Sequence, residues 1–135
     1  MLVEVARAGA AAGLTQRQIA EAIGRSQPEV SRLLRFHGQT TLGRALEHNR
    51  AAILKAAAAA GARNVRVFGS VSRGEDTSES DIDLLVDLSD DVTLFGLGRL
   101  ETEIAKIVGA KVDVVPAGNL RANIRDRVLA EALPL

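Results

Sequence analysis

The sequence lacks several residue types, and each absence removes a class of structure or function. It contains no Cys, which excludes disulfides and thiolate metal sites and agrees with a reducing cytoplasm. No apolar run is long enough to span a bilayer, and the N-terminus has no basic segment followed by a long apolar core. Because Tyr and Trp are also absent, only Phe36, Phe68 and Phe95 offer rings for stacking on a nucleotide base, and all three suit a core equally well. We therefore expect a cytoplasmic protein with no membrane contact.

Charge is unevenly distributed along the 135 residues, although the formal net charge is zero. Residues 1–50 carry seven Arg and four Glu, a balance of +3, whereas residues 51–135 carry ten basic and thirteen acidic side chains, a balance of −3. A basic front half favours contact with nucleic acid, and an acidic back half favours contact with cations. A chain of this length holds one ordinary domain or two small ones. We predict a first module over 1–38, a polar linker at 39–41 and a second domain over 42–135.

The first module contains two short helices with strong start signals. Thr15 with Gln18, and Ser26 with Glu29, each have the spacing of a capping box at a helix N-terminus. Gly24 lies between the two helices and permits a tight turn. Two short helices joined in this way form a helix-turn-helix by geometry.

Residues 16–35 resemble the helix-turn-helix DNA-binding domains of bacterial regulators. The resemblance rests on Ala20 at the helix crossing, Gly24 in the turn, and Val30 and Leu33 in the shared core. It implies that the helix from residue 27 is a recognition helix, whose side chains read base edges or hold phosphates. The residues offered to DNA are then Gln27, Ser31, Arg32 and Arg35. A helical hairpin that only covers the second domain or binds a protein remains the alternative.

Apolar spacing predicts the elements on either side of the linker. It indicates helices over residues 1–12, 42–60, 92–108 and 120–132, and strands over 65–68, 81–88 and 111–115. The helix between the last two strands permits a parallel pair with a right-handed crossover, whereas the first strand suits antiparallel pairing.

The stretch GSVSRGE at residues 69–75 has the features of a phosphate-binding loop. Gly69 follows a buried strand and lets the backbone approach a ligand without a Cβ in the way. Ser70 suits the N-cap of a short helix, whose free N–H groups attract anions. Arg73, one turn further on, reaches the same phosphates as a forked donor.

Three Asp residues form a candidate metal site next to this loop. In SDIDLLV at residues 80–86, Asp81 and Asp83 share one face of a strand and lie about 7 Å apart. Two such carboxylates can bracket a pair of Mg²⁺ ions roughly 3.5–4 Å apart. Asp113 lies near the start of the next strand, and parallel pairing would bring it beside the other two. Asp87 is in phase with them but further along, and we expect it to be solvated.

The loop and the acidic strand together resemble the minimal nucleotidyltransferases of the DNA polymerase β superfamily. Their signature is G-S-x-x-R-G-E, a short spacer, then S-D-x-D-L-L-V, and every position of it is filled at residues 69–75 and 80–86. Asp113 matches the family's third carboxylate. The implied fold is α+β, a small mixed three-stranded sheet flanked by helices and preceded by the all-α module. The implied roles are two Mg²⁺ ions on Asp81, Asp83 and Asp113, and ATP phosphates on Gly69, Ser70 and Arg73.

The residues do not identify the acceptor of the nucleotide, but the resemblance implies one. Minimal nucleotidyltransferases of this length are commonly antitoxins that pair with a HEPN-domain ribonuclease toxin and silence it by transferring AMP to a tyrosine near its active site. The implied activity is that of a Mg-dependent protein adenylyltransferase, and the helix-turn-helix would let it repress its own operon at operator DNA. A homodimer and a hetero-oligomer with the toxin both remain open.

Two other functions remain as alternatives. One is a DNA-binding transcriptional regulator whose nucleotidyltransferase domain senses nucleotide without catalysis, and the intact trio of Asp argues against it. The other is a small-molecule nucleotidyltransferase that modifies an antibiotic such as an aminoglycoside. The short chain disfavours this second alternative, because it leaves little room for a substrate-binding domain.

Overall fold

The computed structural model describes residues 2–135, which fall into two compact units, one ending at Arg35 and the other spanning Phe36–Leu135. The sequence predicted a later boundary. The second unit takes in the chain from Phe36 because this ring is buried in its core and the Phe36 N–H donates to the carbonyl of Pro134. The Gly38 N–H is likewise held by the carboxylate of Glu47. The predicted linker therefore belongs to the second unit by its contacts.

The first unit is a three-helix unit built from local signals. Its helices are α1 (Leu2–Ala11), α2 (Gln16–Ile23) and α3 (Gln27–Leu34). Both predicted capping boxes form, at Thr15 and Ser26. Gly24 ends α2 with a φ of 68°, the left-handed conformation that Gly adopts without a steric cost. The helices close over a small apolar core: Ala6, Ile19, Ala20 and Val30.

The second unit opens with two helices, α4 (Thr41–His48) and α5 (Arg50–Ala59), where the sequence predicted one continuous helix over 42–60. The chain leaves helical geometry at Asn49, whose side-chain amide donates to the carbonyl of Ala45 at 2.8 Å. Asn side chains compete in this way with the backbone bonds of a helix. Apolar spacing alone does not register such a break, because it continues across Asn49.

A mixed four-stranded sheet forms the centre of this unit. Its strands are β1 (Ala62–Phe68), β2 (Ile82–Leu88), β3 (Val112–Pro116) and β4 (Leu133–Pro134), in the order β3-β2-β1-β4. As predicted, β1 is antiparallel to β2 and β2 is parallel to β3. The two-residue β4, antiparallel to β1, adds a fourth strand to the predicted three.

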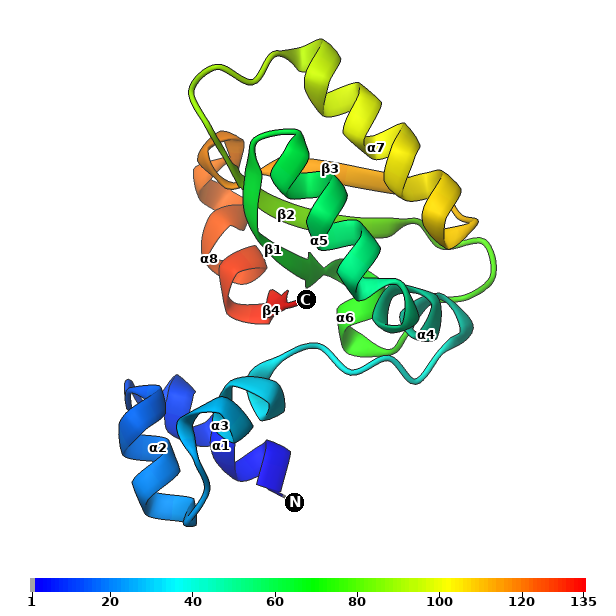
Figure 1. Cartoon of the computed structure of the whole chain (residues 1–135). Coiled ribbons are helices and arrows are strands. Elements are labelled where there is room, and N and C mark those ends of the chain that lie inside the picture. The colour runs from blue at the N-terminus through cyan, green and yellow to red at the C-terminus, as the bar shows by residue number, and fades with distance from the viewer. Residues whose placement is uncertain (1) are drawn as a thin grey trace. The chain divides into compact units, whose positions relative to one another are not determined.

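Helices cover the sheet and connect its strands. The short α6 (Gly69–Arg73) follows β1, α7 (Leu94–Val108) connects β2 to β3, and a 3₁₀ turn (Ala117–Asn119) leads to α8 (Ala122–Glu131). Helix α5 packs on β1, α7 packs on β3, and both pack on each other over one face of the sheet (Figure 1). Among residues 2–135, none of the helices combines the length and the apolar character that crossing a membrane requires.

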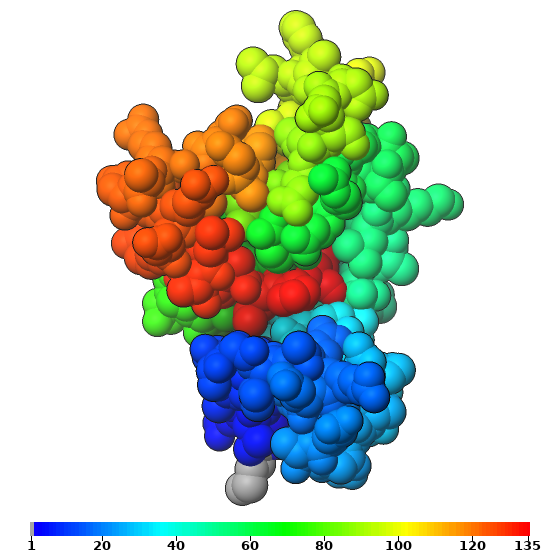
Figure 2. Space-filling view, turned by 90° about the vertical axis from the view of Figure 1, so that its left-hand side faces the viewer, coloured from blue at the N-terminus to red at the C-terminus, as the bar shows by residue number. Residues whose placement is uncertain are grey.

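The last residues of the second unit are fixed to β1. Leu133 pairs with Val67, and the Leu135 N–H donates to the carbonyl of Val65. The carbonyl of Leu135 accepts from the Arg50 guanidinium at 2.7 Å. Figure 2 shows these residues, in red, seated in the surface beside α8 and not projecting from it. This pairing places the end of α8 next to the loop that follows β1.

Candidate active site

The loop after β1 lies directly against the acidic strand β2. Phe68 pairs with Asp83 across the antiparallel strands, and Gly69 follows with a φ of 74°. A Cβ on residue 69 would collide with Oδ2 of Asp83, so only Gly fits this position without a shift of its neighbour. Helix α6 begins at Gly69, so Ser70 lies in its first turn and is not the N-cap that the sequence predicted. The loop that begins at Gly69 therefore lies close to the carboxylate of Asp83, as the sequence predicted.

Asp83 and Asp113 lie side by side on one face of the sheet. The parallel register pairs Asp83 with Asp113, and it pairs the buried Ile82 with Val112 and Leu84 with Val114. These apolar neighbours pack in the core under α5 and α7. Because side chains alternate along a strand, both Asp side chains face away from those helices. The predicted meeting of these two carboxylates at one edge of the sheet follows from this register.

The pKa of Asp83 reflects this crowding. Burial raises it to about 6, and the negative charges of Asp113, Asp81 and Glu131 add to the effect, whereas Arg73 opposes it. A carboxyl group whose pKa rises next to like charges gains from a nearby cation, which favours its ionised form. Asp83 is therefore the electrostatic centre of the acidic cluster, which we define as Asp81, Asp83 and Asp113.

Asp81 occupies the edge of the cluster, directly before β2. Its Oδ2 lies 3.4 Å from the ammonium of Lys111, and both side chains are substantially exposed. The Ile82 N–H also donates to the carbonyl of Lys111, which fixes the two chain segments against each other. Lys111 is a neighbour of the site that sequence reasoning missed, although it lies only two residues before Asp113.

The acidic cluster has the donor chemistry of a Mg²⁺ site, because carboxylate oxygens are the ligands that this hard cation prefers. The raised pKa of Asp83 also fits a nearby cation, which would favour the ionised form of this carboxyl group. In the conformation described, however, no three His, Cys, Asp or Glu side chains within residues 2–135 converge closely enough to hold a metal ion.

The predicted phosphate-binding loop holds a carboxylate, which comes from the end of α8. Oε1 of Glu131 accepts from the Gly69 N–H at 3.0 Å, and Oε2 accepts from the Arg73 guanidinium at 2.8 Å. Glu75 accepts a second bond from Arg73, at 3.1 Å, and these two carboxylates raise the pKa of Arg73. Sequence reasoning missed Glu131, because it lies 62 residues from Gly69 and reaches the loop only through the pairing of β4 with β1.

The predicted DNA-contacting residues lie in the first unit. Gln27, Ser31 and Arg32 belong to α3, whereas Arg35 is the residue that ends it. Gln27 and Arg32 are exposed, and Ser31 and Arg35 are partly buried. All four therefore lie along or just after the helix that the sequence predicted.

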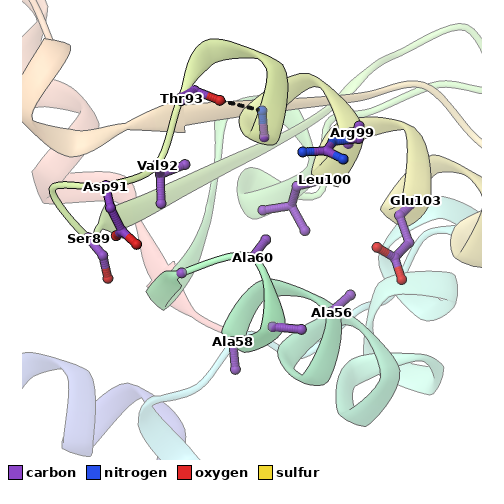
Figure 3. A pocket seen from close by; sticks show the side chains of 13 residues that line it. Ala56, Ala58, Ala60, Ser89, Asp91, Val92, Thr93, Arg99, Leu100 and Glu103 are labelled. Atoms are coloured by element: carbon purple, nitrogen blue, oxygen red, sulfur yellow. Dashed lines mark hydrogen bonds between the residues drawn. The ribbon is translucent and has the colours of Figure 1, made fainter.

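A hollow of the second unit lies away from the acidic cluster. It has a volume of about 730 Å³ and lies between α5, the loop after β2 and the first turns of α7 (Figure 3). Asp91, Arg99 and Glu103 contribute charged side chains to its wall. Because it adjoins the end of β2 and Asp83 lies at the start, this hollow is separate from the candidate site.

A small mixed sheet, a loop that begins with Gly and two carboxylates in register beside it are together typical of nucleotidyl-transfer domains. The family model described as "Nucleotidyltransferase domain" matches residues 52–134, and the chain belongs to this family. The Protein adenylyltransferase MntA of Thermococcus cleftensis is 37% identical over 73 residues, which is 54% of this chain and 74% of that protein.

Solved structures give the same fold. The chain described as "Structure of putative minimal nucleotidyltransferase" matches with a TM-score of 0.63 and 42% identity, covering 68% of this chain and 94% of that one. A toxin-antitoxin structure with AMP-PNP matches with a TM-score of 0.55 and 23% identity, covering 62% of this chain and 69% of that one. The matches confirm the α+β nucleotidyltransferase fold that the sequence predicted.

Proposed function

We propose that the second unit transfers AMP from ATP to a hydroxyl group of another protein. The observation that carries this proposal is the register of Asp83 with Asp113, next to a loop whose Gly69 has no Cβ and so lets the carboxylate of Asp83 lie close to its backbone. Membership of the nucleotidyltransferase family and the similarity to a protein adenylyltransferase support it.

The roles of the site residues follow from their positions. Asp81, Asp83 and Asp113 would hold two Mg²⁺ ions, which when bound lower the pKa of the attacking hydroxyl and neutralise the departing pyrophosphate. The backbone at Gly69 and Ser70 would bind the triphosphate through N–H groups, and Arg73 would add a charged donor. Asp113 would also accept the proton of the attacking hydroxyl.

The acceptor belongs to a second protein in this proposal. The similarity to a protein adenylyltransferase supports a protein acceptor, and the sequence contains no Tyr that could itself accept AMP. We propose that the acceptor is a tyrosine of a HEPN-domain toxin, and that the chain is its antitoxin. The fold it shares with a chain of a toxin-antitoxin structure supports this choice of partner.

For the first unit we propose binding to operator DNA. The support is the basic balance of residues 1–35, five Arg against three Glu, and the position of Gln27, Ser31 and Arg32 on the capped helix α3. A filter-binding titration of the full chain on promoter DNA tests this, because phosphate contacts make affinity fall steeply as salt rises. Absence of binding at low salt would leave the first unit as a protein-contact element.

Intact-protein mass spectrometry tests the transfer. The chain is incubated with ATP, Mg²⁺ and a HEPN-domain protein as the candidate acceptor, and the expected result is one added AMP on that protein and none with Asp83→Asn. Asp126→Asn, an exposed position on α8, is the matched control and should transfer normally. Nucleotide binding without any transfer would favour the regulator that senses nucleotide, and AMP on a free metabolite would favour the small-molecule enzyme.

A further inference from the structure

The phosphate loop is occupied by an anion from its own chain. The carboxylate of Glu131 binds the Gly69 N–H through one oxygen and the Arg73 guanidinium through the other, at 3.0 and 2.8 Å. A backbone N–H and an Arg fork are also the donors that phosphate oxygens bind in proteins. Glu131 therefore makes the contacts that we assign to a phosphate.

The position of Glu131 is set by backbone pairing and not by a flexible surface contact. Glu131 ends α8, and Leu133, two residues later, pairs with Val67 of β1. Gly69 lies two residues after Val67, so the pairing of β4 with β1 brings Glu131 to the loop. Its side chain is only 20% exposed, which separates it from an ordinary surface ion pair.

Glu131 also adds negative charge to a site that must accept a polyanion. Burial is the largest cause of the raised pKa of Asp83, and Glu131 contributes to it together with Asp113 and Asp81. A triphosphate entering the loop would meet this charge and compete for the same two donors. Arg73 has a second partner in Glu75, at 3.1 Å, and this hydrogen bond still holds Arg73 when its bond to Glu131 breaks.

We infer that Glu131 is a positioning residue that holds the Gly69 N–H and Arg73 in the phosphate-binding arrangement until a nucleotide triphosphate displaces its carboxylate. This inference rests on the proposed function, since it takes residues 69–73 to be the phosphate loop. The carboxylate keeps the loop formed in the free protein, and its removal leaves the donors open to the nucleotide. Glu131 thereby sets the affinity for nucleotide without touching the reacting atoms.

Calorimetric titration with ATP in EDTA tests this, because neither metal nor acceptor protein enters the measurement. Glu131→Gln keeps the shape and the bond from Gly69 but removes the competing charge, and the Kd for ATP is expected to fall about tenfold. Glu103→Gln removes the same charge from α7, where Glu103 lines the separate hollow, and should leave the Kd unchanged. The thermal midpoint of each variant is measured alongside.

Weaker ATP binding by Glu131→Gln, with a lower thermal midpoint, would mean a purely structural role and would overturn the inference. Binding that is unchanged in EDTA and weaker only with Mg²⁺ would make Glu131 a metal ligand and overturn it too. If Glu131→Gln does not fold, Glu131→Asp decides, because a shorter carboxylate reaches the loop less well and should bind ATP about threefold more tightly. Equal or weaker binding by Glu131→Asp counts against the inference.

The failures of the two proposals are distinguishable. If the wild-type chain binds ATP, and Glu131→Gln binds it more tightly, but no AMP reaches a protein, the proposed function fails and this inference stands. If AMP is transferred normally while Glu131→Gln binds ATP no more tightly than wild type, this inference alone fails.

Discussion

The two ends of β2 each carry an Asp on the same face of the strand, and their surroundings are opposite. At the start, burial and like charges raise the pKa of Asp83 to about 6. Near the end, Asp87 accepts hydrogen bonds from Asn64 at 3.0 Å and Arg66 at 2.8 Å, and the bond from Asn64 is the largest cause of its lowered pKa. A carboxylate with its own partners stabilises the fold, whereas a crowded one is available to a cation. The two Asp residues therefore differ because of the side chains that the neighbouring strands place beside them: Asn64 and Arg66 beside Asp87, and Asp113 beside Asp83.

The largest effect should come from the partner of Asp83 across the parallel strands. Asp113→Asn removes one of two carboxylates in register, and we expect AMP transfer to fall by about a thousandfold or more, because in the proposed function this group acts on the reacting atoms. Transfer is measured as AMP incorporated into the acceptor protein per unit time. Asp87→Asn, at the other end of the strand, should keep at least about half of wild-type transfer. Equal losses in both variants would erase the contrast between the two ends.

Gly69→Ala should destabilise the start of the strand and lower transfer. The new Cβ would collide with Oδ2 of Asp83, and an Ala residue would have to adopt the left-handed φ of 74° that Gly69 has. We therefore expect the free energy of unfolding to fall by about 1–3 kcal/mol. Urea denaturation measures the change. Gly98→Ala is the matched control: it lies inside α7 with nothing near its Cβ, and should stabilise by about 0.5–1 kcal/mol. A Gly69→Ala variant as stable as wild type would remove the argument from close approach.

The raised pKa of Asp83 makes the fold less stable as pH rises from 3.8 to about 6. The folded state holds a proton in this window that the unfolded state has lost, so the free energy of unfolding falls with rising pH. Asp83→Asn removes this slope and should stabilise the metal-free chain at neutral pH by about 1–2 kcal/mol, after a discount for solvent screening. Thermal unfolding of both proteins at pH 4 and pH 7.5 checks this. A variant less stable than wild type at pH 7.5 would contradict it.

The smallest effect should come from the satisfied end of the strand. The pKa of Asp87 is lowered, so its stabilisation is present above its unfolded pKa and is lost as pH falls through its folded pKa. Asp87→Asn should therefore destabilise the chain by less than about 1 kcal/mol at neutral pH and by nothing measurable at low pH. Urea midpoints at pH 7 and pH 3 test this. A gain in stability at pH 7 would show that Asp87 is crowded in the same way as Asp83.

The sequence predicted the pairing of Asp83 with Asp113 because the signals for it are short in range or imposed by topology. The predicted convergence of all three Asp side chains is not found within residues 2–135. Alternation places Asp83 opposite the buried Ile82, and the crossover through α7 requires a parallel partner that carries Asp113. The collision that reserves residue 69 for Gly agrees with the loop expected there. Each of these inferences needs only the period of a strand and the order of elements.

The rest of the site could not be predicted because its signals are long in range. Strand β4 has two residues, one of them Pro134, and so shows no alternation. Without β4, nothing in the sequence places Glu131 beside Gly69, or Phe36 in the core of the second unit. The break at Asn49 is a local event, but apolar spacing continues through it. Contacts that depend on the pairing of distant segments produce no repeating pattern of apolar residues in the sequence.

Pairing of the last strand with the first also fixes the time at which the site matures. The bond between Gly69 and Glu131 spans 62 residues, and the bond between Arg50 and Leu135 spans 85. Contacts of such separation form late, because the loop they close must lose its freedom first. A chain still emerging from the ribosome can pair β1 with β2 before the carboxylate of Glu131 reaches the proposed phosphate loop. The order of synthesis therefore leaves a nascent loop open until residue 131 has been added.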